Sequence, residues 1–427
     1  MNANEKWGFR HLMIFIILSA AVAIAYQLPY LRYTFYDQMM ATLQLTNTQM
    51  GMLATAVNVA SVISYPIGGF FANRFSMRTL LLITLTAFVG LTVWFAFTTN
   101  YIMLMIIHVL YGFFGIATLW SAYLTGIRNL GNENNQSKIF GSSEATRGIL
   151  QTLLGFAFLG IMGVAAAPAI GFKTLLLVGA GVTGIFLILA FIFLPKTQKQ
   201  DETLLEDNAA AEKTNYTIGD VLKNPGVWIT IIVLMSAYLS WSLGNGYLTT
   251  YTVQVLGISE SLASTLGIIR SYIIVFIAGF LGGYVLDKFT YKGKAFVIMF
   301  TLVIATLLGV MLSSALVPVC VALTLVIAFI ANVMKSTYWS IMGQAGIPVG
   351  MTALATGVIS FLIFMPDMIV TPICGAWLDA AVAAGNIAAG FNKIFILLIV
   401  FSAIGILGSI LLIRKTKQIK AKEGLAE

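Results

Sequence analysis

Residues 69–78 read GFFANRFSMR, and residues 283–294 read GYVLDKFTYKGK. Each segment begins on a glycine, carries a polar residue four positions later and then gathers basic side chains. Each also joins two long apolar runs, and a helix needs about 20 mainly apolar residues to cross a bilayer. The two segments therefore predict short loops between membrane-spanning helices, at two separate places in the chain.

The composition of the whole chain agrees with this prediction. Of 427 residues, 59% are apolar and only 9% are charged, against about 25% charged in an ordinary soluble domain. A water-soluble globule needs a polar exterior, which these proportions cannot supply. They also exclude disordered, collagen-like and disulfide-scaffold proteins. We therefore predict an all-α polytopic membrane protein.

Twelve apolar stretches are long enough to be transmembrane helices. They lie at 11–31, 49–72, 79–98, 102–126, 143–165, 174–194, 227–250, 262–286, 295–315, 317–343, 352–377 and 391–413. The shortest connection is predicted to be a tight turn at Leu316, just before Pro318. An alternative for residues 1–25 is a cleavable signal peptide, since a basic start precedes an apolar run. The run continues to Leu31, which favours a first span.

The distribution of basic residues predicts the orientation. Most of the 24 lysines and arginines fall in alternate loops, and only Lys173 and Lys393 fall clearly on the opposite side. Cytoplasmic loops carry such an excess of positive charge. We therefore predict both termini in the cytoplasm. The net charge of +8 is then a topology signal, and no nucleic-acid partner is expected.

One long polar connection, residues 195–225, separates six spans from six. We predict an N-terminal six-helix bundle over residues 1–194, a cytoplasmic linker over 195–225, and a C-terminal six-helix bundle over 226–427 with a short cytoplasmic tail. Within the linker, residues 216–223 are expected to form a short helix at the membrane interface.

The two opening segments resemble motif A of the major facilitator superfamily, roughly G-x-x-x-D-[RK]-x-G-x-[RK]. The resemblance covers the whole chain and implies two pseudo-symmetric helical bundles, with a substrate site near the bilayer midplane. It also implies a conformational latch formed by Gly69, Asn73, Arg74, Arg78, Gly283, Asp287 and Lys288. Asn73 departs from the pattern, because it replaces an aspartate and carries no charge. The alternative is that both glycines only permit tight turns and the basic residues only set the topology.

Other segments resemble a narrower group, the YihN-like bacterial permeases. They are residues 26–32, 45–51, 129–136 and 139–148. That group is distantly similar to the organophosphate:anion antiporters, which carry an arginine in the first helix and another in the seventh. Arg32 matches the first, but the seventh span here has neither Arg nor Lys. The seventh span therefore lacks the second arginine of such a phosphate clamp. The resemblance to bacterial permeases also implies that the spans lie in the inner membrane of a bacterium.

Ionisable groups inside a membrane are expensive and mark functional sites by default. The candidates for binding substrate are the cations Arg270, Lys335, Arg147 and Arg32. The candidates for proton coupling are Asp367 and Glu144. The alternative is a structural role: Glu144 and Arg147 are three residues apart and can neutralise each other, Asp367 can pair with Arg270 or Lys335, and Arg32 can anchor at the outer interface.

Uncharged side chains in the spans complete the set of candidates. Trp241 and Asn245 are assigned to the substrate site, since a ring can stack on a solute and an amide can bind it. The alternative is that such aromatic residues form interfacial belts and that such amides join helices. His108 is expected to be a hydrogen-bonded structural histidine.

The excess of candidate cations over candidate acids favours an anionic solute. We predict a secondary active transporter that moves a small polar, anionic organic solute by alternating access. A proton or counter-solute is the expected coupling partner, and the protein is expected to be a monomer in the lipid bilayer.

The alternatives are a proton-coupled exporter of hydrophobic or drug-like compounds, and a non-transporting membrane sensor of the same fold. No enzyme activity, cofactor or metal is predicted, because no catalytic or nucleotide motif is present and two cysteines are too few for a metal site.

Overall fold

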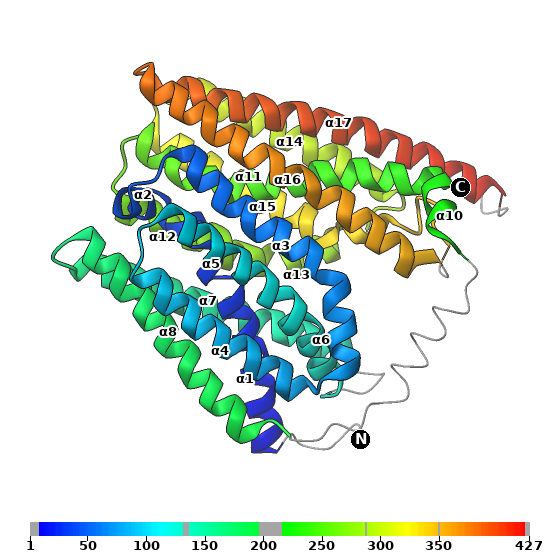
Figure 1. The fold of residues 1–427 in the computed structure, drawn as a ribbon. Helices are drawn as coiled ribbons and strands as arrows, with labels where there is room; N and C mark the ends of the chain where they lie inside the picture. The colour runs from blue at the N-terminus through cyan, green and yellow to red at the C-terminus, as the bar shows by residue number, and fades with distance from the viewer. Residues whose placement is uncertain (1–7, 131–135, 196–215, 287, 349–350, 423–427) are drawn as a thin grey trace. The chain divides into compact units, whose positions relative to one another are not determined.

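The computed structural model describes residues 8–130, 136–195, 216–286, 288–348 and 351–422, and it is helical throughout these ranges apart from short connections (Figure 1). The chain divides into two compact units. The first comprises Met1–Gln198, Ile258–Phe276 and Thr371–Ala376. The second comprises Lys199–Gly257, Ile277–Val370 and Trp377–Glu427.

The elements follow one another in a simple order. The first half contains α1 (Phe9–Ala25), η1 (Leu28–Tyr30), α2 (Arg32–Leu43), α3 (Asn47–Arg74), α4 (Met77–Ala96), α5 (Tyr101–Phe113), η2 (Phe114–Trp120), α6 (Ser121–Arg128), α7 (Gln136–Val164) and α8 (Pro168–Phe193). The second half contains α10 (Ile218–Lys223), α11 (Pro225–Gln254), α12 (Glu260–Ile268), η3 (Ile269–Ile273), α13 (Ile274–Leu286), α14 (Lys292–Leu312), α15 (Val317–Thr337), η4 (Tyr338–Ile341), α16 (Thr352–Ala383) and α17 (Ile387–Lys422).

The membrane-spanning helices lie where the apolar stretches predict them. Among the described residues, 11 helical segments are long and apolar enough to cross a bilayer. Helix α3, with 28 residues, occupies the remaining predicted span. The tight turn predicted at Leu316 is confirmed, since α14 ends at Leu312 and α15 begins at Val317.

Four predicted spans differ from a single regular α-helix, and the tenth is one of them because the 3-10 segment η4 follows α15. The first was predicted to reach Leu31, but α1 ends at Ala25 and the short helix η1 follows, with Pro29 inside it. Proline has no backbone N–H to continue the α-helical ladder. The fourth and eighth spans contain the π-helical segments η2 and η3. Such segments are uncommon and often occur at functional sites.

Several helix starts are fixed by side chains that cap them. Thr46 and Gln49 form a capping box at the start of α3, and Thr217 and Asp220 form another at the start of α10. These side chains satisfy backbone N–H groups that have no partner inside the helix. Hydrogen bonds from the backbone and hydroxyl of Thr217 lower the pKa of the exposed Asp220 carboxyl. The predicted helix at 216–223 is therefore present as α10, while its place at the interface remains a prediction.

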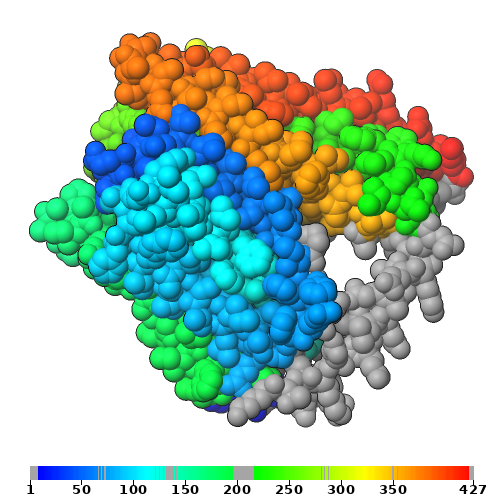
Figure 2. Space-filling view, viewed as in Figure 1, coloured from blue at the N-terminus to red at the C-terminus, as the bar shows by residue number. Residues whose placement is uncertain are grey.

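Close packing inside each unit depends on glycine. Helices α3 and α5 lie against each other, as Figure 2 shows in space-filling form. A Cβ atom at Gly112 of α5 would collide with the backbone oxygen of Val57 on α3. In the second unit, a Cβ at Gly405 of α17 would meet the ring of Phe300 on α14. Small residues let membrane helices approach to this distance.

Candidate functional site

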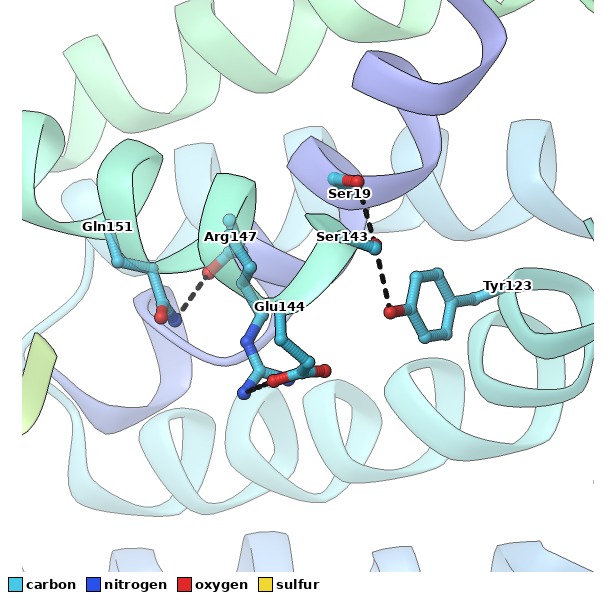
Figure 3. Close-up of polar contacts among 7 residues, drawn as sticks. Ser19, Tyr123, Ser143, Glu144, Arg147 and Gln151 are labelled. Carbon is cyan, nitrogen blue, oxygen red and sulfur yellow. Dashed lines mark hydrogen bonds and ion pairs between the residues drawn. The ribbon is translucent and has the colours of Figure 1, made fainter. Parts of the chain in front are cut away.

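Helix α7 of the first unit carries an ion pair between Glu144 and Arg147, the contact predicted for this spacing (Figure 3). The side chains are 47% and 23% exposed, respectively. The guanidinium of Arg147 also lies over the ring of Tyr26, 5.9 Å from its centroid. A partly exposed cation on an aromatic ring keeps its charge available to a ligand while the ring stabilises it.

Five aromatic rings form a connected cluster that includes Tyr26, the ring beneath this arginine. Tyr26 and Tyr30 are stacked with centroids 6.3 Å apart, and Tyr30 and Tyr33 with centroids 5.5 Å apart. Trp120 contacts Tyr26 at 6.1 Å and Tyr123 at 5.7 Å. We call these five residues the tyrosine cluster. The positions 26, 30 and 33 follow helical spacing, which was the signal in the sequence that could have identified them.

Buried hydrogen bonds hold α7 against α1. The side-chain amide of Gln27 donates to the backbone oxygen of Gln151 at 3.1 Å, and Gln151 donates to the backbone oxygen of Ala23 at 3.1 Å. The hydroxyl of Ser143 lies 2.8 Å from that of Ser19 and 3.0 Å from that of Tyr123 (Figure 3). These bonds fix the helix turn that carries Glu144 and Arg147.

Two further candidate arginines of the first unit, Arg32 and Arg270, are buried. Arg32 opens α2 with 4% exposure and lies 5.5 Å from the ring centroid of Tyr36. That burial differs from the position of an interfacial anchor, which keeps its charged end in water. Arg270 is 1% exposed and lies within the π-helical segment η3. Gln38 on α2 donates to the hydroxyl of Ser264 on α12 at 3.1 Å. This hydrogen bond joins α2, which begins with Arg32, to α12, which directly precedes η3 and Arg270.

In the second unit, Asp367 on α16 is held by two hydroxyl groups of α11. Ser242 donates to one carboxylate oxygen at 2.8 Å, and Tyr238 donates to the other at 3.3 Å. All three side chains are at most 9% exposed. Two donated hydrogen bonds suit an ionised carboxylate, because it offers only acceptors.

Lys335 on α15 is the second charged group that rests on α11. Its ammonium lies 3.1 Å from the centroid of the Trp241 ring. The indole N–H of Trp241 donates to Asn332 at 2.8 Å, and Asn332 donates to the backbone oxygen of Ala328 at 2.8 Å. This chain of contacts fixes the plane of the ring beneath the lysine.

Helix α11 therefore presents one polar face to both charges. Tyr238, Trp241 and Ser242 lie on it at positions that recur every three or four residues, and the buried Asn245 continues the series. Tyr238 and Ser242 were missed by the sequence analysis, which selected only Trp241 and Asn245 from this span. Spacing at i, i+3, i+4 and i+7 was the available signal.

The motif A residues are only partly described. Asp287 lies outside the described residues. The surroundings of Gly69, Asn73 and Gly283 are likewise not described. Arg74 lies 4.4 Å from the ring centroid of Phe70, Lys288 lies 4.3 Å from that of Tyr284, and Arg78 donates to the backbone oxygen of Phe191 at 2.6 Å. The latch assignment therefore remains a prediction.

Two smaller observations complete the inventory. His108 is buried and its Nδ1 lies 2.7 Å from the backbone oxygen of Leu104, which agrees with the structural role predicted for it. Within the described part of the chain, no group of three or more His, Cys, Asp or Glu residues could hold a metal ion.

Charged side chains inside the spans of an all-helical membrane protein mark a functional site by default, and substrate pathways of polytopic transporters are built in this way. The chain matches the model of the Major Facilitator Superfamily over residues 11–371, and it belongs to that family. The predicted fold class, twelve transmembrane helices in two six-helix bundles, is the fold of this family and is confirmed.

Relatives and solved structures agree with this assignment. The chain is 25% identical over 437 residues to the inner membrane protein YihN of Escherichia coli, covering 100% of this chain and 99% of the relative. It is 26% identical over 398 residues to the inner membrane protein YqcE of the same organism, covering 90% of each. A D-xylose–proton symporter matches with a TM-score of 0.71 at 15% identity, covering 94% of this chain and 96% of that one. A bacterial homologue of the lysosomal transporter Spinster matches with a TM-score of 0.72 at 13% identity, covering 97% and 99%. At these identities the structures show the shared fold alone.

Proposed function

We propose that the protein moves a small polar organic anion across the membrane as a secondary active transporter. The observation that carries this proposal is shared by the two units. Arg147 and Lys335 are partly exposed cations within membrane spans, and each lies over an aromatic ring. A cation of this kind binds a carboxylate, phosphate or sulfonate group through charge-assisted hydrogen bonds.

The rings next to these cations suit the organic part of such a solute. The tyrosine cluster and Trp241 offer flat apolar faces beside polar edges, the combination that accepts a sugar or another ring. Asn245, Arg32 and Arg270 are further candidates for contact with the solute.

Asp367 is the proposed site of proton coupling. Protonation would remove the negative charge and make one of the two oxygens a hydroxyl, so the hydrogen bonds from Ser242 and Tyr238 would lose their charge assistance and weaken. The carboxyl of α16 would then separate more easily from α11. Glu144 is the second candidate for proton coupling. Protonation of Glu144 would remove the negative charge that neutralises Arg147.

The remaining assignments follow from charge pattern and family. We infer that both termini are cytoplasmic, that the membrane is the bacterial inner membrane, and that the protein works as a monomer without enzyme activity. We also infer six-helix bundles over residues 1–194 and 226–427 joined by the linker 195–225, with motif A as a conformational latch. Movement by alternating access is the mode of transport expected for this fold.

A two-stage experiment tests the proposal. A thermal-shift screen of sugars, sugar acids, organic phosphates and sulfonates on the purified protein should identify the solute class, because a ligand bound only to the folded state raises the melting temperature. Uptake of the best ligand is then measured in proteoliposomes. Stabilisation by charged solutes but not by their uncharged analogues supports an anion transporter. Stabilisation by hydrophobic cations alone would instead favour the exporter and contradict the proposal.

A further inference from the structure

A cavity of about 240 Å³ lies among helices α13, α14 and α15 of the second unit. Its walls are apolar throughout and include Leu281, Val285, Ile298, Leu302, Phe329 and Ile330. None of the candidate transport residues contributes to it. A cavity without polar partners does not hold ordered water, so an apolar occupant suits it better.

The cavity opens toward the outside of the helices. Leu281, Val285, Ile298 and Leu302 line it and are still between 41% and 50% exposed, whereas Ile330 at its base is 7% exposed. Apolar side chains exposed on a transmembrane helix face the hydrocarbon of the bilayer. The cavity is therefore within reach of a lipid acyl chain.

Positive charge gathers where α14 begins. Lys294 directly precedes Ala295, which lines the cavity. The ammonium groups of Lys294, Lys417 and Lys420 lie 5.3, 5.7 and 5.0 Å from the ring centroid of the same residue, Tyr291. We call Lys294, Lys417 and Lys420 the lysine cluster. Three like charges around one ring repel each other, and an anion among them would relieve that repulsion.

We propose that this cavity holds one acyl chain of an anionic phospholipid whose headgroup binds the lysine cluster. The two halves of such a lipid match the two features: an apolar chain for the apolar walls and a phosphate for the lysines. Lys288, which follows the cavity-lining α13 in the chain, adds a further cation at this end. The inference does not depend on the proposed transport activity.

The test is native mass spectrometry of the full-length protein after exposure to phosphatidylglycerol or phosphatidylethanolamine. The wild-type protein should retain phosphatidylglycerol in preference to phosphatidylethanolamine. Lys294→Gln, Lys417→Gln and Lys420→Gln should each weaken retention about fivefold, the effect of one lysine near an anionic headgroup. Lys173→Gln is the matched control, because Lys173 also lies on an aromatic ring, that of Phe97, but in the first unit.

The acyl chain is tested separately from the headgroup. Ala295→Phe should fill the cavity and abolish retention of phosphatidylglycerol, and Ile298→Trp, at a half-exposed position, serves if the first variant does not fold. Ile185→Phe adds bulk to an exposed position of α8 and should have no effect. Equal retention of the two lipids, or normal retention in the filled variants, overturns the proposal. Displacement by soluble glycerol phosphate would also overturn it, since the lysines would then bind a free anion without an acyl chain.

Discussion

The two units hold their membrane charges in different ways. In the first unit, Glu144 and Arg147 belong to one helix and neutralise each other three residues apart. In the second unit, Asp367 and Lys335 come from different helices, and each is held by residues of a third, α11. A pair within one helix persists when helices move, whereas contacts between helices change. The second unit is therefore the better place to couple charge to movement.

The largest effect is expected at Asp367. Asp367→Asn keeps the size of the side chain but removes its charge and its ability to bind a proton. If this residue couples transport to protons, accumulation driven by a pH gradient should disappear, while exchange of solute across the membrane continues. Uptake and counterflow in proteoliposomes measure the two activities.

The matching change in the first unit is Glu144→Gln, which should leave most of the pH-driven accumulation intact. Accumulation that persists in Asp367→Asn but is lost in Glu144→Gln would reverse the comparison and move the proton site to α7.

The next largest effect is expected for the cations. Lys335→Gln and Arg147→Gln each remove one charge-assisted hydrogen bond to an anionic solute, a loss of about 1.5–3 kcal/mol, or roughly ten- to a hundredfold in transport efficiency. Arg147→Gln should have the greater effect, because it also leaves the carboxylate of Glu144 without its partner, and that negative charge repels an anionic solute. Size-exclusion chromatography in detergent checks that each variant is folded. Normal transport in both variants would exclude the anion hypothesis.

A smaller effect is expected on stability alone. Gly112→Ala places a Cβ against the backbone of α3, which cannot move aside, and should cost about 1–3 kcal/mol. Gly405→Ala meets the ring of Phe300, a side chain that can shift, and should cost less. Gly90→Ala has open space around it and serves as the control, with a neutral or slightly stabilising effect. Thermal unfolding in detergent ranks the three variants, and equal melting temperatures would contradict the packing argument.

The smallest effect is expected in motif A. Asn73→Asp would give the first copy of the motif the acid that the second copy has in Asp287. A partly exposed ion pair or helix-end charge contributes about 1 kcal/mol, enough to change a balanced conformational equilibrium several-fold. Cysteine labelling rates at the two loops that follow motif A measure that change. An unaltered rate would mean that position 73 serves only as a turn residue.

Sequence predicted the positions of the helices well because crossing a bilayer requires a long apolar run, and such runs are visible without any structure. The break after Ala25 was harder to predict, since Tyr26, Leu28 and Leu31 are apolar enough to continue a span. The π-helical segments left no signal in composition at all, because they change hydrogen-bond geometry and not hydropathy.

The candidate site was predicted in part. Charges stand out against an apolar background, so Arg147, Lys335 and Asp367 were found, and the pairing of Glu144 with Arg147 followed from their spacing. The side chains that hold the charges of the second unit were missed. Tyr238 and Ser242 are ordinary residues in a span, and they acquire their importance only because α16 brings Asp367 to them. Contacts between distant parts of a chain cannot be read from local spacing.

The π-helical segment η3 has a consequence for how the gene can change in length. Each residue of an α-helix turns the chain by about 100°, so deleting one residue from a regular span rotates everything beyond it and exchanges its buried and lipid-facing sides. A π-helical turn already accommodates one residue more than an α-helical turn. Deleting one residue within Ile269–Ile273 would restore regular α geometry and leave the faces of α12 and α13 in register. The same holds for Phe114–Trp120 in the fourth span. These two segments are therefore places inside the spans where single-codon deletions can survive selection.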